Sequence, residues 1–293
     1  LSGVFGGNKN PSPEMAEAIA KALGADTATQ EKARHYAEAV NALRSKPQVE
    51  TRWRVETFAL KRPPVPEGAA PSALLNARYR VVDFTGRDEE LRVLAEWRDN
   101  PGSALRVRLL HGQGGQGKTR LAAKFAACSD KKHWVVGQVR HRSDAARPAK
   151  LLPAGRLRTA FGLLLVLDYA ERWPVQDLVD CLISYQAGIR ADKRTVPVRV
   201  LLLARPSGGW WQGVRGALGE HDLTAVTADQ LAPLVPAPAD RQLLFDAACN
   251  RFAHRLECAD ITSVERPPKL ATDPEYGRAL TVQMAGTGVF TLT

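Results

Sequence analysis

The feature that most restricts how this chain can fold is a glycine-rich stretch at residues 112–119. It reads GQGGQGKT and fits the phosphate-binding pattern GxxxxGK(S/T) at every fixed position. Such a loop needs glycine because its backbone must adopt positive φ and bring successive N–H groups against phosphate oxygens, where a Cβ would interfere. The pattern requires a strand before it and a helix after it, because the N-terminal N–H groups and dipole of the helix complete the anion site.

The flanking sequence predicts both elements. Residues 105–111 (LRVRLLH) predict a strand, and residues 120–128 (RLAAKFAAC) predict a helix with one apolar face. We therefore interpret the stretch as a phosphate-binding loop and not as a flexible turn. Lys118 is expected to reach the β- and γ-phosphates, and the hydroxyl of Thr119 to be a ligand of Mg²⁺. The residues predicted to bind the nucleotide are Gly112, Gln113, Gly114, Gly115, Gln116, Gly117, Lys118 and Thr119.

A second strong signal is the apolar run at residues 161–168 (FGLLLVLD), which ends in an acid. Strands that helices cover on both faces are apolar throughout, so this run predicts a central strand of a parallel sheet. Asp168 at its carboxyl end is expected to project into the crevice where such sheets bind ligands and to hold Mg²⁺. A helix-capping aspartate is the alternative. Residues 133–139 and 196–204 predict two more strands, and together these elements predict an α/β fold with helices flanking a parallel sheet.

A family resemblance rests on residues 84–91, which read FTGRDEEL and lie shortly before the loop. This box, followed by the loop, resembles the entry to the nucleotide-binding domain in the STAND class of signal-transduction ATPases, a branch related to AAA+ proteins. The resemblance implies a P-loop NTPase fold, ATP and Mg²⁺ as cofactors, and Phe84 and Arg87 close to the nucleoside. For Arg87, an ordinary charge at a helix entry is the alternative. ATP in place of GTP rests on this resemblance alone.

The same resemblance implies roles for two more residues. Arg205, at the end of the strand at 196–204, would contact the γ-phosphate as a sensor, and a surface arginine is the alternative. Many hydrolysing relatives place a glutamate directly after the magnesium-binding aspartate, whereas Tyr169 and Ala170 separate Asp168 from Glu171 here. Glu171 is thus the candidate base that activates water, with a surface or capping role as the alternative. We count Lys118, Glu171 and Arg205 as the candidate catalytic residues.

The first 44 residues predict two helices. Ser12 is a good N-cap with Pro13 after it, and Gly24 stands where a C-cap glycine is expected. Residues 1–25 resemble the end of a Cro or phage-repressor helix-turn-helix domain. The resemblance implies that the recognition helix lies mostly before Leu1, and that DNA is a partner of a complete N-terminal domain. A small helical bundle is the alternative.

The chain as a whole predicts four parts: a helical segment at 1–44, a proline-rich linker at 45–80, a P-loop nucleotide-binding domain at 81–230 and a partial helical lid at 231–293. In the family a GxP box lies in the lid, and its nearest match here has Ala279 at the proline position. The sequence has no apolar run long enough for a membrane helix, so we expect a cytoplasmic protein that contacts no membrane. Whether the protein forms a homo-oligomer is left open by the sequence.

We expect the protein to be a regulatory switch that binds ATP and hydrolyses it slowly. Two alternatives stay open: a conventional AAA+-like ATPase, and a DNA-binding transcriptional regulator with an ATPase domain. The net charge of +10 is compatible with either a nucleotide or nucleic acid.

Overall fold

The computed structural model of the chain describes residues 12–45, 52–144, 152, 159–191, 196–235, 237–256 and 265–288. Contacts divide the chain into two units, the first ending at Arg52 and the second beginning at Trp53. Residues 1–11, the first part of the run that resembles a helix-turn-helix domain, lie outside the described residues.

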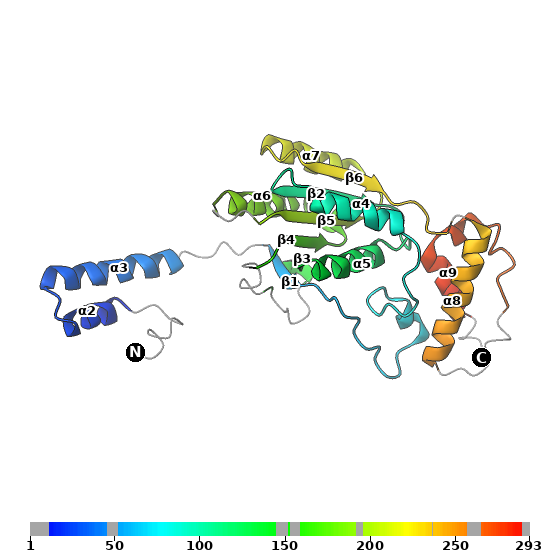
Figure 1. Cartoon of the computed structure of the whole chain (residues 1–293), viewed down its shortest axis with the longest axis horizontal. Coiled ribbons are helices and arrows are strands. Elements are labelled where there is room, and N and C mark those ends of the chain that lie inside the picture. The colour runs from blue at the N-terminus through cyan, green and yellow to red at the C-terminus, as the bar shows by residue number, and fades with distance from the viewer. Residues whose placement is uncertain are drawn as a thin grey trace. The chain divides into compact units, whose positions relative to one another are not determined.

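The first unit contains two packed helices, α2 (Pro13–Ala22) and α3 (Thr27–Ser45), which are blue in Figure 1. The predicted ends of α2 are confirmed: the Ser12 hydroxyl oxygen accepts a hydrogen bond from the Met15 N–H at 3.2 Å, and Gly24 has a φ of 79°. The Asp26 carboxylate starts α3 by accepting from the Thr29 N–H at 2.8 Å. DNA binding through this unit stays a prediction.

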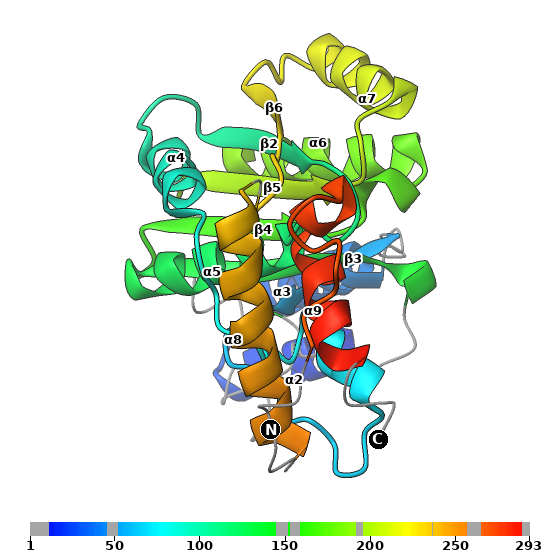
Figure 2. The same ribbon diagram turned by 90° about the vertical axis from the view of Figure 1, so that its right-hand side faces the viewer.

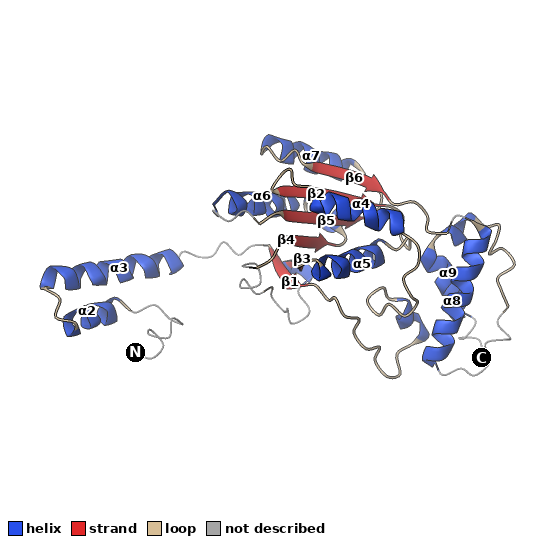
Figure 3. Ribbon diagram, in the orientation of Figure 1, coloured by secondary structure: helices blue, strands red, loops and turns tan. Residues whose placement is uncertain are grey.

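The second unit is built on a six-stranded sheet with the order β1-β3-β4-β5-β2-β6. All neighbouring strands are parallel except β1, which is antiparallel to β3. The expected α/β fold is therefore confirmed, and Figure 3 shows the strands as one layer between helices. The strands are β1 (Trp53–Thr57), β2 (Leu105–His111), β3 (Trp134–His141), β4 (Gly162–Leu167), β5 (Val198–Ala204) and β6 (Val226–Gln230).

Helices cover both faces of the sheet. On one face α4 (Asp88–Asp99) and α5 (Lys118–Lys131) pack on the strands, and on the other face α6 (Val175–Ala191) and α7 (Gly209–Glu220) do so. Every residue of β4 and β5 is buried. This double coverage explains why both strands are apolar almost throughout.

The expected linker at 45–80 was partly wrong, because it contains the strand β1 and a short 3-10 helix, η1 (Pro71–Leu75). β1 is an edge strand, and its polar side chains make ion pairs. The Glu56 carboxylate accepts from the Arg54 guanidinium at 2.6 Å and from that of Arg140, on β3, at 3.0 Å. The strand thus lacks the apolar pattern that marks an inner strand, and charged edge residues also discourage pairing with other chains.

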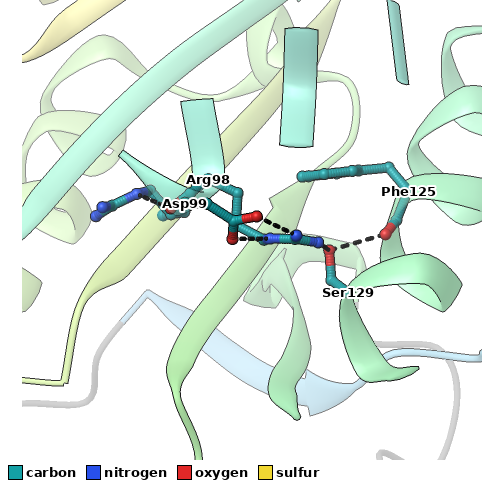
Figure 4. A network of polar contacts seen from close by, with 5 residues as sticks. Arg98, Asp99, Phe125 and Ser129 are labelled. Atoms are coloured by element: carbon teal, nitrogen blue, oxygen red, sulfur yellow. Dashed lines mark hydrogen bonds and ion pairs between the residues drawn. The ribbon is translucent and has the colours of Figure 1, made fainter. Parts of the chain in front are cut away.

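A buried arginine ties α4 to α5 at the amino edge of the sheet (Figure 4). The Arg98 guanidinium, with 2% of its side chain exposed, donates two hydrogen bonds of 2.7 Å to the Asp99 carboxylate and one of 2.9 Å to the Ser129 hydroxyl. Ser129 in turn donates to the Phe125 carbonyl at 2.8 Å. This network fixes α4, and with it the segment that enters the sheet, against the helix that follows the glycine-rich loop.

The C-terminal part is helical, as expected. α8 (Pro238–Leu256), the short 3-10 helix η5 (Pro274–Gly277) and α9 (Ala279–Gly288) share an apolar cluster with Leu74 of η1 and with Val82, and Figure 2 shows α8 and α9 side by side. We refer to α8 and α9 as the lid helices. Within the described ranges, no helix has the length and apolar character needed to cross a bilayer.

Candidate nucleotide site

The glycine-rich loop connects β2 to α5, as the motif requires. Gly112, Gly115 and Gly117 have φ values of 156°, 81° and 89°, so the loop uses its glycines at positive φ. Gly117 is the N-cap of α5, which begins at Lys118. The N-terminal N–H groups of a buried helix therefore point into the loop, which is the arrangement that binds phosphate.

Lys118 folds back over this loop. Its ammonium group donates hydrogen bonds to the carbonyls of Gly112 at 2.6 Å and Gln113 at 2.9 Å. The pKa of Lys118 is lowered, first by burial; the charges of Asp168 and Glu171 oppose this effect, and that of Arg205 adds to it. The charges of all three predicted partners therefore influence Lys118.

The predicted magnesium ligands lie side by side. The Thr119 hydroxyl donates to the Asp168 carboxylate at 2.9 Å, and the other oxygen of that carboxylate accepts from the Tyr169 N–H at 3.0 Å. Burial raises the pKa of Asp168, while these two hydrogen bonds act to lower it. One hydroxyl and one carboxylate oxygen are hard donors that fit Mg²⁺.

The strand after the acid completes the pattern: β5 lies between β2 and β4, with Ala204 opposite His111 and Leu202 opposite Leu167. Glycine-rich loop, acid and intervening strand end at the same edge of one parallel sheet. This is a P-loop NTPase fold.

A backbone kink brings Glu171 to the site. Tyr169 has a φ of 57°, which is unusual for a bulky residue, and it leads into the 3-10 helix η4 (Ala170–Arg172), in which Ala170 is fully buried. The chain therefore turns, and Glu171 comes within electrostatic range of Lys118. One carboxylate oxygen of Glu171 is buried without a hydrogen-bond partner within the described part of the chain. An unpartnered buried acceptor at this place is available to a ligand or water.

Arg205 follows β5 directly and is exposed. Because β5 lies between β2 and β4, its end lies between the glycine-rich loop and Asp168. The arginine is thus placed where the predicted sensor should be, and its role stays a prediction.

Phe84 and Arg87, the two residues expected near the nucleoside, have different surroundings. Phe84 is half-buried and packs against the cluster beneath α4 and α5, with the Lys124 ammonium 5.9 Å from its ring centroid. Arg87 is buried, and its guanidinium is held by Glu90 and by two backbone carbonyls, those of Gln116 and Ala232. Both terminal nitrogens of the Arg87 guanidinium are therefore hydrogen-bonded within the protein.

Sequence reasoning missed a contact between the lid helices and the loop. The Leu280 N–H, in the first turn of α9, donates to the Gly115 carbonyl at 3.0 Å. The degenerate GxP box, with Ala279 at the proline position, therefore lies beside the glycine-rich loop. The spacing from Gly277 to Ala279 was the only signal in the sequence for this contact.

No protein-family model and no curated protein matches the chain. Among solved structures it is similar to the ORC2 protein of Aeropyrum pernix in ADPNP–ADP complexes, with 16% identity and a TM-score of 0.45 over 71% of this chain and 63% of that chain. NtrX from Brucella abortus in complex with ADP has 16% identity and a TM-score of 0.46 over 76% of this chain and 54% of that chain. PCH-2 of C. elegans has 11% identity and a TM-score of 0.37 over 77% of this chain and 74% of that chain. This chain thus spans less than two thirds of ORC2 and about half of NtrX, and likenesses this distant say nothing about function.

Proposed function

We propose that the protein binds ATP with Mg²⁺ and acts as a slowly hydrolysing regulatory switch of the STAND type. The observation that carries the proposal is the 2.9 Å hydrogen bond between Thr119 and Asp168, beside a glycine-rich loop at a helix N-terminus. Thr119 and Asp168 would hold the ion, whose charge stabilises the phosphates when it is bound. Lys118 would leave the Gly112 and Gln113 carbonyls to reach the β- and γ-phosphates.

The position of Glu171 supports slow hydrolysis. The charge of its carboxylate acts on Lys118, and one of its oxygens is buried without a hydrogen-bond partner among the described residues, as suits a base that accepts a proton from attacking water. Glu171 is the third residue after Asp168 and follows the kink at Tyr169. Its distance from the attacking water would therefore depend on the conformation of this turn and not on the strand itself. Arg205 would neutralise charge on the γ-phosphate from the end of β5.

The contact between Leu280 and Gly115 supports a switch. A loop that changes shape on binding phosphate would also change its contact with α9, and ATP and ADP would then favour different positions of the lid helices. A conventional AAA+-like ATPase would use the same residues but would turn over faster.

The test is Mg·ATP binding by isothermal titration calorimetry on three variants. Lys118→Ala is expected to raise the Kd by about 10- to 100-fold, since a hydrogen bond to a charged group contributes about 1.5–3 kcal/mol. Asp168→Asn is expected to remove the Mg²⁺ dependence of binding. The matched control is Lys131→Ala, an exposed lysine in the last turn of the same helix, which should leave the Kd unchanged.

Two results would contradict the proposal. Absence of binding at millimolar Mg·ATP, or equal weakening by Lys131→Ala, would rule out the site. Turnover above about 1 s⁻¹, in the range of ordinary enzymes, would favour the conventional ATPase over a switch whose turnover is expected on the order of 10⁻³ s⁻¹.

A further inference from the structure

Arg87 joins three segments that are far apart in the sequence. Its side chain is 6% exposed, and one terminal nitrogen donates both to the Gln116 carbonyl at 3.2 Å and to the Ala232 carbonyl at 2.6 Å, while the other bonds Glu90. Arg87 has a φ of 69°, a left-handed conformation that is unfavourable for a non-glycine residue. The surrounding contacts hold the residue in this position in spite of that cost.

Ala232 lies in the segment that connects the sheet to the lid helices. At the sheet end, the Leu231 N–H donates to the His111 carbonyl at 2.8 Å, which continues the pairing of β6 with β2. At the other end, the Arg241 guanidinium in α8 donates to the Val235 carbonyl at 3.0 Å. Arg87 therefore anchors this connecting segment to the glycine-rich loop.

The residue before Gln116 in the loop contacts the lid helices directly, because the Gly115 carbonyl accepts from the Leu280 N–H in α9. Each of these carbonyls shares a rigid, planar peptide unit with the N–H of the following residue. The Gly115 carbonyl is coplanar with the Gln116 N–H, and the Gln116 carbonyl with the Gly117 N–H. Any rotation that turns these N–H groups toward a phosphate must also turn the two carbonyls that Arg87 and Leu280 hold.

We propose that Arg87 is a positioning residue that couples the shape of the phosphate-binding loop to the lid helices through the Gln116 and Ala232 carbonyls. The inference rests on the proposed function, because phosphate binding supplies the change in the loop. It assigns Arg87 a role through backbone carbonyls, in place of the nucleoside contact that the family resemblance implies.

The test is hydrogen exchange with and without saturating Mg·ATP, read separately in peptides from the loop and from the lid helices. In the unaltered protein, nucleotide is expected to slow exchange in both regions, by about 10-fold in the lid helices. Arg87→Met keeps an unbranched apolar side chain that matches the aliphatic part of arginine and removes its donors. The loop should still respond at saturation, while the slowing of exchange in the lid helices falls to about 2-fold, the part that the bond between Leu280 and Gly115 still transmits.

Two further variants distinguish coupling from a loss of folding. Arg87→Lys can still donate from one nitrogen to both carbonyls, so it should restore part of the lid response. Glu90→Gln removes the negative charge of the third partner of Arg87 and leaves both carbonyl bonds, so exchange in its lid helices should respond to nucleotide as in the unaltered protein.

The outcomes separate this inference from the proposed function. A full lid response in Arg87→Met, or a lid response lost equally in Glu90→Gln, overturns the coupling while nucleotide binding stands. A normal lid response at saturation, together with a much higher Kd in Arg87→Met, identifies a nucleoside contact instead and also overturns it. If neither region of the unaltered protein responds to Mg·ATP, both the coupling and the proposed function fail.

Discussion

The contact between the glycine-rich loop and α9 can be tested by three glycine-to-alanine substitutions in one loop. Gly114 has open space around it and a φ outside the left-handed region; Gly117 also has open space, with a φ of 89°. Gly115 has a φ of 81°, and a Cβ built on it would lie 2.9 Å from the Leu280 Cβ. The series therefore separates backbone strain from contact with the lid helices.

The expected losses of unfolding free energy differ in steps. Gly114→Ala should cost nothing or gain up to about 1 kcal/mol, because alanine restricts the unfolded chain. Gly117→Ala should cost about 1–2 kcal/mol for a left-handed residue. Gly115→Ala should cost that amount plus about 1–3 kcal/mol for overpacking against Leu280, or roughly 2–5 kcal/mol in total.

The assay is urea unfolding of the ligand-free protein followed by tryptophan fluorescence. All six tryptophans lie at Trp53 or later, so the signal reports the second unit alone. At an unchanged m value, the midpoints should fall in the order Gly114→Ala, Gly117→Ala, Gly115→Ala. Equal losses in Gly115→Ala and Gly117→Ala would refute the contact with Leu280, and a large loss in Gly114→Ala would refute the loop conformation itself.

Three other predictions concern catalysis, the core and the cysteines. Glu171→Gln should lower ATP turnover by about 10²–10⁴-fold with little change in Kd, as single-turnover and binding measurements can show, and unchanged turnover would exclude Glu171 as the base. Leu165→Ala, at a fully buried position of β4, should cost about 2–5 kcal/mol in urea unfolding, whereas Phe161→Ala, at 67% exposure, should stay within about 0.5 kcal/mol. Cys128 should react with a maleimide well before Cys181, because burial raises the pKa of Cys181 and leaves less thiolate at neutral pH; equal labelling in peptide maps would contradict this.

The inner strands could be predicted from the sequence, but the edge strands could not. β4 and β5 are buried along their whole length, so each reads as an apolar run. β1 and β6 pair on one side only, and β6 (VTADQ) exposes polar side chains. An edge strand forms because it pairs with one neighbouring strand, and it need not be buried. Its sequence therefore lacks an apolar run and resembles that of a loop.

Part of the candidate site could likewise be predicted from the sequence, and part could not. The glycine-rich loop and Asp168 were predictable because the chemistry of phosphate and magnesium prescribes the residue types and their order. The bonds of Arg87 to Gln116 and Ala232 join residues 29 and 145 positions away, and their acceptors are backbone carbonyls that any residue could supply. No residue pattern can indicate such partners.

Strand order explains why the charged groups of the site meet. Residues 112–119, Asp168 and Arg205 are separated in the sequence by strands and helices that could be arranged in several ways. Insertion of β5 between β2 and β4 puts the end of the arginine-bearing strand between the loop and the acid. Lys118 then has Asp168 and Glu171 as negative neighbours and Arg205 as a positive one. At this sheet edge the two cations can face a bound polyphosphate and the carboxylates its metal ion, whereas a strand order that put β5 away from β2 and β4 would separate the arginine from the charge that it is proposed to sense.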